Sequence, residues 1–167
     1  PPYVSATFSP ASCLLQDNCT SVMTINASSL APVDTYTITV AGSMLGKTTT
    51  FNLTITEAFN YSLSVDAPST AVAKGYSFSR VITVTKTAGP VQSVSLAASG
   101  LPYQSTASFS PASCAPNSTC SSTVTITTSS LTPNGDSTIT FTGTGNPLSK
   151  TVTFLMRVVD QDVVFNF

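Results

Sequence analysis

The sequence predicts an all-β protein, because apolar residues alternate with polar ones along most of the chain. Segments such as TYTITV (35–40), TFNLTI (50–55) and STITFTG (137–143) place a polar residue, nearly always Thr or Ser, at every second position. A period of two puts the apolar side chains on one face of a half-buried antiparallel strand. Serine and threonine make up about a third of the 167 residues, and β-branched threonine suits the solvent-facing side of a sheet. No segment keeps a helical period over the length of a helix.

The composition indicates a folded chain and excludes two classes of function. Apolar residues make up 41% of the chain and charged residues 8%, whereas disordered chains combine low hydrophobicity with high charge. The six Lys and Arg residues are dispersed singly and the net charge is −1, so no basic cluster is available to bind nucleic acid. No apolar run approaches the roughly 20 residues of a membrane-spanning helix, and we expect no membrane insertion.

An internal repeat defines the units of the fold. Nine residues recur 101 positions later in the chain: Phe8, Pro10, Cys13, Cys19, Ile25, Leu30, Pro32, Ile38 and Gly42 match Phe109, Pro111, Cys114, Cys120, Ile126, Leu131, Pro133, Ile139 and Gly143. After a two-residue insertion, KTTTF (47–51) matches KTVTF (150–154). A period of about 100 residues with about seven short strands is typical of an immunoglobulin-like (Ig-like) sandwich. The predicted fold is therefore a tandem array of antiparallel, Greek-key Ig-like β-sandwiches.

One complete Ig-like unit is expected over residues 58–160. Its strands are predicted, in order, at 59–65, 76–85, 91–98, 106–110, 122–128, 137–143 and 150–159. Its core is expected to include Phe78, Ile82, Val84, Val94, Leu96, Phe109, Val124, Ile126, Ile139, Phe141, Val152, Phe154 and Met156. The chain has no Trp and its cysteines do not link distant strands, so an antibody-type domain is not expected.

The first unit is predicted to be incomplete. Residues 1–57 match only the C-terminal half of a unit, from its fourth strand onward. Residues 161–167 are expected to be the first strand of a further unit or a donor strand, since FNF resembles FNY at 59–61. Half a sandwich exposes apolar faces and unpaired strand edges. The expected partners are therefore adjacent Ig-like repeats of a longer array, which we favour, or copies of the chain that donate strands.

The four cysteines are expected to form two disulfides, one in each unit. Cys13 with Cys19 and Cys114 with Cys120 keep the same spacing although the residues between them differ. Of the three possible connectivities, pairing within each unit is therefore the natural one. A zinc site would need four ligands in one place, and a redox-active pair is usually spaced C-x-x-C. Structural disulfides persist in oxidising compartments, so we expect an extracellular or cell-surface protein.

Five asparagines lie in N-x-S/T sequons and are candidates for N-glycosylation: Asn18, Asn26, Asn52, Asn60 and Asn117. Asn52 lies between Phe51 and Leu53, and Asn60 between Phe59 and Tyr61, so alternation points both outward. Unmodified polar asparagines are the alternative.

The sequence predicts no enzyme and no cofactor. The chain has no His, which excludes Ser-His-Asp and Cys-His arrangements within it. The seven acidic residues are isolated except Asp160 and Asp162, a weak candidate for a calcium site at the unit boundary, with a solvated linker as the favoured alternative. Tyr3 and Tyr103 stand beside prolines in predicted loops and are weak candidates for sugar binding, although packing is the better explanation for most aromatic residues here.

The chain resembles the tandem Ig-like repeats of large secreted bacterial and archaeal surface or filament proteins. The resemblance rests on GLPYQSTASFSPASC (100–114), STVTITTSSLTPNGDSTITFTGTG (122–145) and SKTVTF (149–154), and it covers nearly the whole sequence. It implies an extracellular structural module of a surface filament, pilus-like fibre or stalk. The alternative is an adhesin, or a carbohydrate-binding accessory module of a secreted protein, with glycans as partners.

Overall fold

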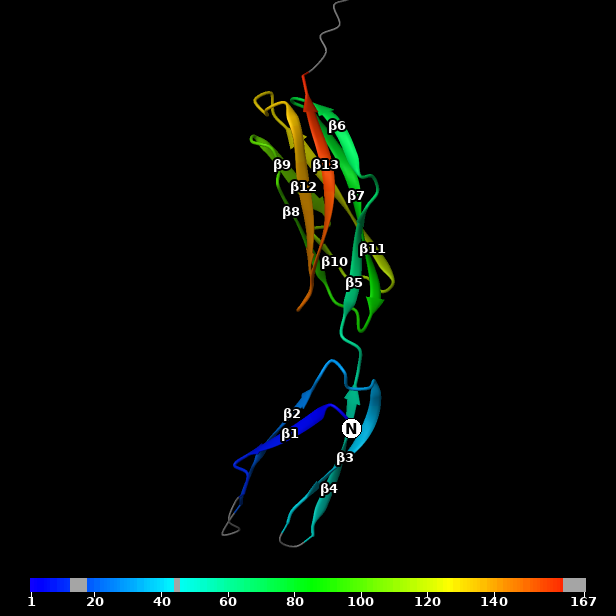
Figure 1. Cartoon of the computed structure of the whole chain (residues 1–167), viewed down its shortest axis with the longest axis vertical. Helices are drawn as coiled ribbons and strands as arrows, with labels where there is room; N and C mark the ends of the chain where they lie inside the picture. The colour runs from blue at the N-terminus through cyan, green and yellow to red at the C-terminus, as the bar shows by residue number, and fades with distance from the viewer. Residues whose placement is uncertain (13–17, 44–45, 161–167) are drawn as a thin grey trace, which may run out of the picture. The chain divides into compact units, whose positions relative to one another are not determined.

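The computed structural model describes residues 1–12, 18–43 and 46–160. The chain divides into two compact units, Pro1–Glu57 and Ala58–Phe167, which we call the first and the second unit. All regular secondary structure in the described residues is β-strand (Figure 1). Within this part of the chain, no helix has the length and apolar character that a membrane crossing requires.

The second unit is an Ig-like β-sandwich of two sheets. One sheet is fully antiparallel and has the order β5 (Asn60–Val65), β7 (Ser77–Ala88), β11 (Thr119–Thr128), β9 (Ser105–Ser110). The other has the order β10 (Ser113–Cys114), β8 (Val94–Ser99), β12 (Gly135–Thr144), β13 (Ser149–Val159), β6 (Ser69–Ala73). This division of strands is that of the immunoglobulin fold, in which an A-B-E-D sheet faces a C-F-G sheet.

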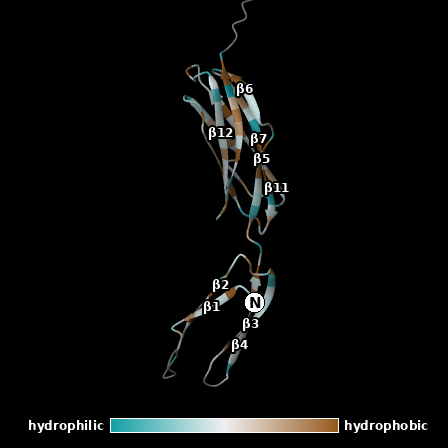
Figure 2. Ribbon diagram, viewed as in Figure 1, coloured by the Kyte–Doolittle hydropathy of each residue, from teal (hydrophilic) through white to brown (hydrophobic). Residues whose placement is uncertain are grey.

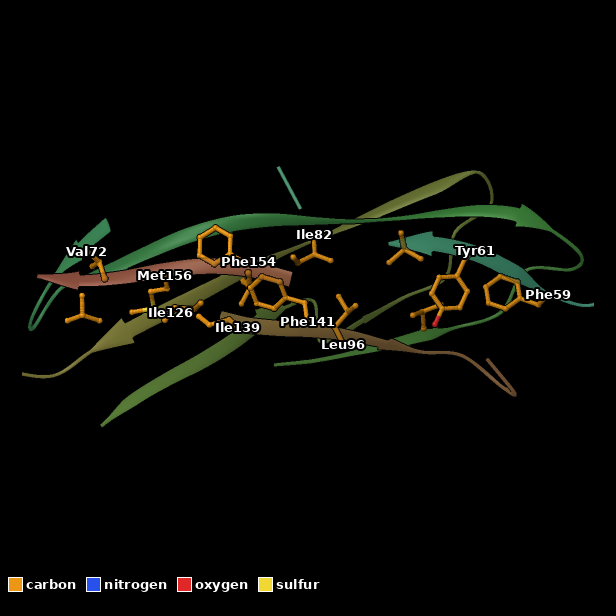
Figure 3. Close-up of a cluster of buried hydrophobic side chains, with 14 residues drawn as sticks. Phe59, Tyr61, Val72, Ile82, Leu96, Ile126, Ile139, Phe141, Phe154 and Met156 are labelled. Carbon is orange, nitrogen blue, oxygen red and sulfur yellow. The ribbon is translucent and has the colours of Figure 1, made fainter. Parts of the chain in front are cut away.

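The core lies between the two sheets, where apolar side chains of both inner faces meet (Figure 3), and Figure 2 colours the strands by the hydropathy of their residues. Its buried apolar members are Phe59, Tyr61, Val72, Ile82, Val84, Val94, Leu96, Val124, Ile126, Ile139, Phe141, Phe154, Met156 and Val158. Ten of the thirteen predicted core residues are among them, because strict alternation along long strands fixes which side chains face inward. The exceptions are Phe78, Phe109 and Val152, which are only partly buried against this core.

Two strands of the second unit are not predicted by the sequence pattern. After β5 ends at Val65, the chain crosses to the other sheet, where β6 pairs in parallel with β13. After β9 ends at Ser110, the chain again changes sheet and forms the two-residue strand β10 beside β8. Both strands are too short for a clear alternation of apolar and polar residues. The unpredicted core residue Val72 lies on β6.

Tyr61 joins β5 of one sheet to the β12–β13 hairpin of the other. Its hydroxyl donates to the carbonyl oxygens of Gly143 at 2.6 Å and Leu148 at 3.2 Å, and its ring stacks on Phe59 (Figure 3). Gly143 leaves the space for these side chains, since a Cβ there would lie 3.1 Å from Val94 Cγ1 and 3.4 Å from Tyr61. Burial raises the pKa of Tyr61, so its hydroxyl keeps the proton that it donates.

The first unit consists of two separate antiparallel hairpins. β1 (Val4–Ser9) pairs with β2 (Val22–Ala27), and β3 (Asp34–Ala41) pairs with β4 (Thr48–Ile55). In the second unit the strands at matching positions are β9 with β11, and β12 with β13. The first unit therefore has counterparts of the strands from β9 onward, the half of the sandwich that the repeat assigns to it.

Replacing Tyr61 with Phe tests how far this buried hydrogen bond stabilises the sandwich. Tyr61→Phe leaves the Gly143 carbonyl without its side-chain donor, and we expect the second unit to lose about 1–2 kcal/mol of unfolding free energy. Tyr103→Phe is the matched control, because the Tyr103 side chain is 73% exposed and should not matter. Urea unfolding of both variants measures the difference, and equal stabilities would contradict the role given to Tyr61.

Candidate functional site: the open faces of the first unit

The hairpins of the first unit have the same pairing register as their counterparts in the second. Val4 lies opposite Ala27, and Ser105 lies opposite Thr128, which is 101 residues further along in each strand. The same side-chain hydrogen bond also follows both first strands: Ser21 Oγ donates to Pro10 O at 2.7 Å, and Ser122 Oγ donates to Pro111 O at 2.6 Å. The two units can therefore be compared position by position.

The comparison shows that the first unit lacks a closed core. None of its described residues is buried. Seven inward apolar positions differ in exposure between the two units. In the second unit they are at most 2% exposed: Val124, Ile126, Ile139, Phe141, Phe154, Met156 and Val158. Their counterparts in the first unit are only half-buried: Met23, Ile25, Ile38, Val40, Phe51, Leu53 and Ile55. The apolar face that a sandwich closes is thus left accessible in this unit.

Three strand edges are also open in the first unit. In the second unit β11 pairs on its far side with β7, β12 with β8, and β13 with β6. Their counterparts β2, β3 and β4 have only their hairpin partners among the described strands. An unpaired edge presents a row of N–H and C=O groups that another strand can pair with. Open edges beside an apolar face make the first unit the leading candidate for an interaction surface.

The three described carboxylates of the second unit are each engaged in an ion pair with a basic residue. Asp66 faces Arg80, Asp136 faces Arg157, and Asp160 faces Lys74. A shallow hollow of about 370 Å³ near the end of β13 includes Asp136, Arg157 and Asp160 in its lining. In the described part of the chain, no three metal-ligating residues lie together. That the protein is not an enzyme remains a prediction.

Asp160, half of the weak calcium candidate, connects three parts of the second unit. Lys74 Nζ at the end of β6 lies 2.9 Å from Asp160 Oδ1, and Asn134 Nδ2 donates to Asp160 Oδ2. The hydrogen bonds from Lys74 and Asn134 hold the pKa of Asp160 below its usual value. Both carboxylate oxygens already accept from protein donors, and the positive charge of Lys74 beside Oδ1 opposes the binding of a cation there. Asp162 lies outside the described residues.

The disulfide of the second unit joins its two sheets. Cys114 on β10 and Cys120 on β11 are bonded with an S–S distance of 2.04 Å, and their Cα atoms are 6.1 Å apart. β10 pairs with β8 in one sheet, and β11 pairs with β7 in the other. In the first unit Cys19 is also disulfide-bonded, whereas its predicted partner Cys13 lies outside the described residues. The bond therefore closes the connection by which the chain passes from β10 in one sheet to β11 in the other.

The sequon asparagines all lie at exposed positions: Asn18, Asn26, Asn52, Asn60 and Asn117. Asn60 is exposed between buried Phe59 and Tyr61, as alternation requires. Each side chain is therefore accessible to glycosylation, which stays a prediction.

The two tyrosines considered for sugar binding lie in different units. Tyr3 is 62% exposed and Tyr103 is 73% exposed. Tyr3 has a φ of 59° and corresponds by the repeat to Gln104, with a φ of 60°, so the two tyrosines are one position out of register. Sugar binding by either residue stays a prediction, and no second aromatic ring is stacked beside either tyrosine in the described structure.

Arg80 is a residue that sequence reasoning missed. It lies on the inward-facing side of β7, where the guanidinium carbon is 5.6 Å from the Phe78 ring centre and 5.8 Å from the Phe154 ring centre. Its Nε is 4.0 Å from Asp66 Oδ1, next to the point where the chain leaves the β5 sheet. Arg80 thus covers the core at the gap left by this crossing. An arginine among alternating residues gives no signal for such a role in the sequence.

No protein-family model matches the chain, and no curated protein matches it. Among solved structures it is similar to domains 4 and 5 of the S-layer protein SbsC, with 22% identity and a TM-score of 0.48 over 76% of this chain and 58% of that one. A longer SbsC structure matches at 21% identity and a TM-score of 0.49, over 81% of this chain and 18% of that one. The E. coli chaperone DraB matches at 17% identity and a TM-score of 0.41, over 60% of this chain and 56% of that one.

The chain thus spans less than two thirds of the S-layer structures that it matches. At TM-scores below 0.5, these likenesses do not decide what the chain does.

Removing the disulfide tests its contribution to the second unit. The double variant Cys114→Ser, Cys120→Ser should lose about 2–3 kcal/mol of unfolding free energy, because the six-residue loop is no longer closed in the unfolded chain. Chemical unfolding measures the loss. A reducing agent should lower the stability of the second unit in the native chain by a similar amount and leave the second unit of the variant unchanged. A variant as stable as the oxidised protein would show that the bond contributes nothing.

Proposed function

We propose that the protein is an extracellular structural module that carries tension in a cell-surface filament, pilus-like fibre or stalk. The observation that supports this is the pairing of β6 with β13 in the second unit. β6 lies near the start of the unit, β13 is its last described strand, and the two are parallel. Force applied at the start of β6 and at the end of β13 therefore pulls these strands along each other in opposite directions.

This geometry loads the whole β6–β13 ladder at once. The ladder extends from Leu155 opposite Ser69 to Val159 opposite Ala73. Separating antiparallel neighbours from one end breaks hydrogen bonds one after another, whereas sliding parallel strands requires all of them to yield together. Resistance to forced unfolding depends on the unfolding rate, which such a shear geometry slows.

Contacts at both ends of the ladder extend it. At its start Leu155 N donates to Pro68 O at 2.9 Å, and at its end Lys74 N donates to Val159 O at 3.0 Å. The ion pair of Lys74 with Asp160 lies just beyond this last hydrogen bond. The end of β13, which leads out of the unit, is therefore connected to β6 through both backbone and side chain.

An extracellular location is proposed from the chemistry of the cysteines. A disulfide that joins two sheets is stable in oxidising compartments and is rare in the cytosol. Scarce charge and exposed sequon asparagines suit a surface exposed to the environment, but the disulfide carries the proposal.

Single-molecule pulling in two directions tests the load-bearing function. Handles at Ala67, just before β6, and at Asp160 load the β6–β13 ladder in shear. Handles at Pro133 and Asp160 peel β12 from β13 starting at the pair Gly135 and Val158. The handle at position 160 is common to both, so it changes the protein in the same way in each experiment. We expect a clearly higher unfolding force in the first geometry at the same loading rate.

Equal forces in the two directions would contradict the proposed load-bearing role. Low force in both directions would leave the second unit as an ordinary sandwich with no mechanical specialisation.

A further inference from the structure

We infer that the first unit is a binding site for the N-terminal half of another Ig-like repeat, a segment with the strand pattern of β5 to β8. The inference concerns which strands complete the first unit, and it holds wherever the protein works. The occupant has a defined chemistry: strands with inward apolar side chains, including a tyrosine near the start. The second unit shows how such a segment, its residues 58–101, is seated.

The first argument is the equivalence of the exposed positions. Seven half-buried apolar side chains of the first unit match residues that the complete sandwich closes in the second unit. That closure depends on β5, β7 and β8, which contribute Tyr61, Ile82, Val84, Val94 and Leu96 to the core. The same hairpins in the same register require the same covering strands.

The second argument is the set of open edges. β7 pairs with β11 over nine residue pairs, from Thr119 opposite Thr85 to Thr127 opposite Ser77. β8 pairs with β12 over five, from Thr140 opposite Ser99 to Thr144 opposite Ser95. β2 and β3 present the corresponding unpaired edges in the first unit. A segment with the strand pattern of β5 to β8 can therefore pair with both edges.

The third argument is the vacant space at Gly42, which matches Gly143. In the second unit a Cβ on Gly143 would meet Val94, Leu63 and Tyr61 at 3.1 to 3.4 Å, three side chains that belong to β5 and β8. At Gly42 the nearest atom within 4 Å is the carbonyl oxygen of Lys47, at 3.7 Å. Gly42 therefore leaves space in the first unit at the position where side chains of β5 and β8 pack in the second unit.

The test adds a segment of this kind to the chain. A copy of residues 58–101 placed directly before Pro1 reproduces the junction at which Leu101 is followed by Pro102, the residue that matches Pro1. Calorimetry is then run on the extended and on the native chain. We expect the enthalpy of unfolding to roughly double, because enthalpy scales with the number of residues that unfold cooperatively.

Two controls separate seating of the segment from mere extension. Gly42→Val should abolish the added enthalpy in the extended chain, because the valine side chain fills the space into which the copied Tyr61 packs. The same substitution in the native chain should change little, since among the described residues no side chain lies within 4 Å of a Cβ at Gly42. Ile82→Ser with Val84→Ser, made only in the copied segment, should also abolish the gain while the transition of the second unit stays intact.

Three results would overturn the inference. The first is an extended chain whose unfolding enthalpy equals that of the native chain, and aggregation of the extended chain with the second unit intact counts the same way. The second is an added transition that survives Gly42→Val. The third is a native chain that already unfolds its first unit cooperatively with a concentration-dependent midpoint, which would make a second copy the occupant. None of these outcomes bears on the pulling experiment, which concerns the second unit alone.

Discussion

The structure depends on one constraint: each sheet can bury its apolar face only against the other sheet. Thr-rich strands alternate so strictly that one face is apolar and the other is polar, and a single sheet of this kind leaves half of its side chains in an unfavourable environment. In the second unit nine strands satisfy the constraint, and Ile82, Val124, Ile139 and Phe141 have no exposed surface. In the first unit four strands of the same pattern do not satisfy it. The contrast arises from which strands are present and not from a difference in sequence pattern.

The features that link the two sheets follow from the same constraint. The chain passes from one sheet to the other at most connections of the second unit, and two of these, after β5 and after β10, carry additional links. The first crossing is covered by Arg80 and leads to the parallel pair β6–β13, and the second is closed by the Cys114–Cys120 disulfide. Crossings are the places where alternation fails and the backbone needs other partners. The side chains found there are therefore the least typical of the pattern and the ones that hold the two sheets together.

How much the sequence predicts depends on the length of each element. Long alternating strands such as β11 and β12 are predicted within a few residues of their bounds, and their inward residues Ile126 and Phe141 are buried as expected. β6 and β10 could not be predicted, because five and two residues are too few to show a period. Phe78 is a miss of another kind: it faces inward as predicted but remains partly buried beside Arg80.

The candidate site follows the same rule. The repeat indicates that the first unit is half a sandwich, because its residues match only the C-terminal half of the second unit. Phe8, Ile25, Ile38 and Gly42 each have a counterpart there. The sequence alone cannot show that Gly42 and Gly143 leave space for the same kind of side chain. That conclusion requires the packing of Tyr61, which lies 82 residues before Gly143 in the chain. Likewise Asp160 reads as a candidate metal ligand in sequence, and only the structure shows Lys74 and Asn134 on its two oxygens.

The central claim is that closure by strands with the pattern of β5 to β8, and not the sequence of the hairpin strands themselves, makes these hairpins stable. Native-state hydrogen exchange on the unmodified chain tests it most directly, by comparing amides at matched positions such as Ile25 with Ile126 and Ile38 with Ile139. The account predicts that the amides of the second unit exchange only through global unfolding, whereas those of the first unit exchange orders of magnitude faster. Equal protection at the matched positions would show that two hairpins suffice, and it would contradict the account.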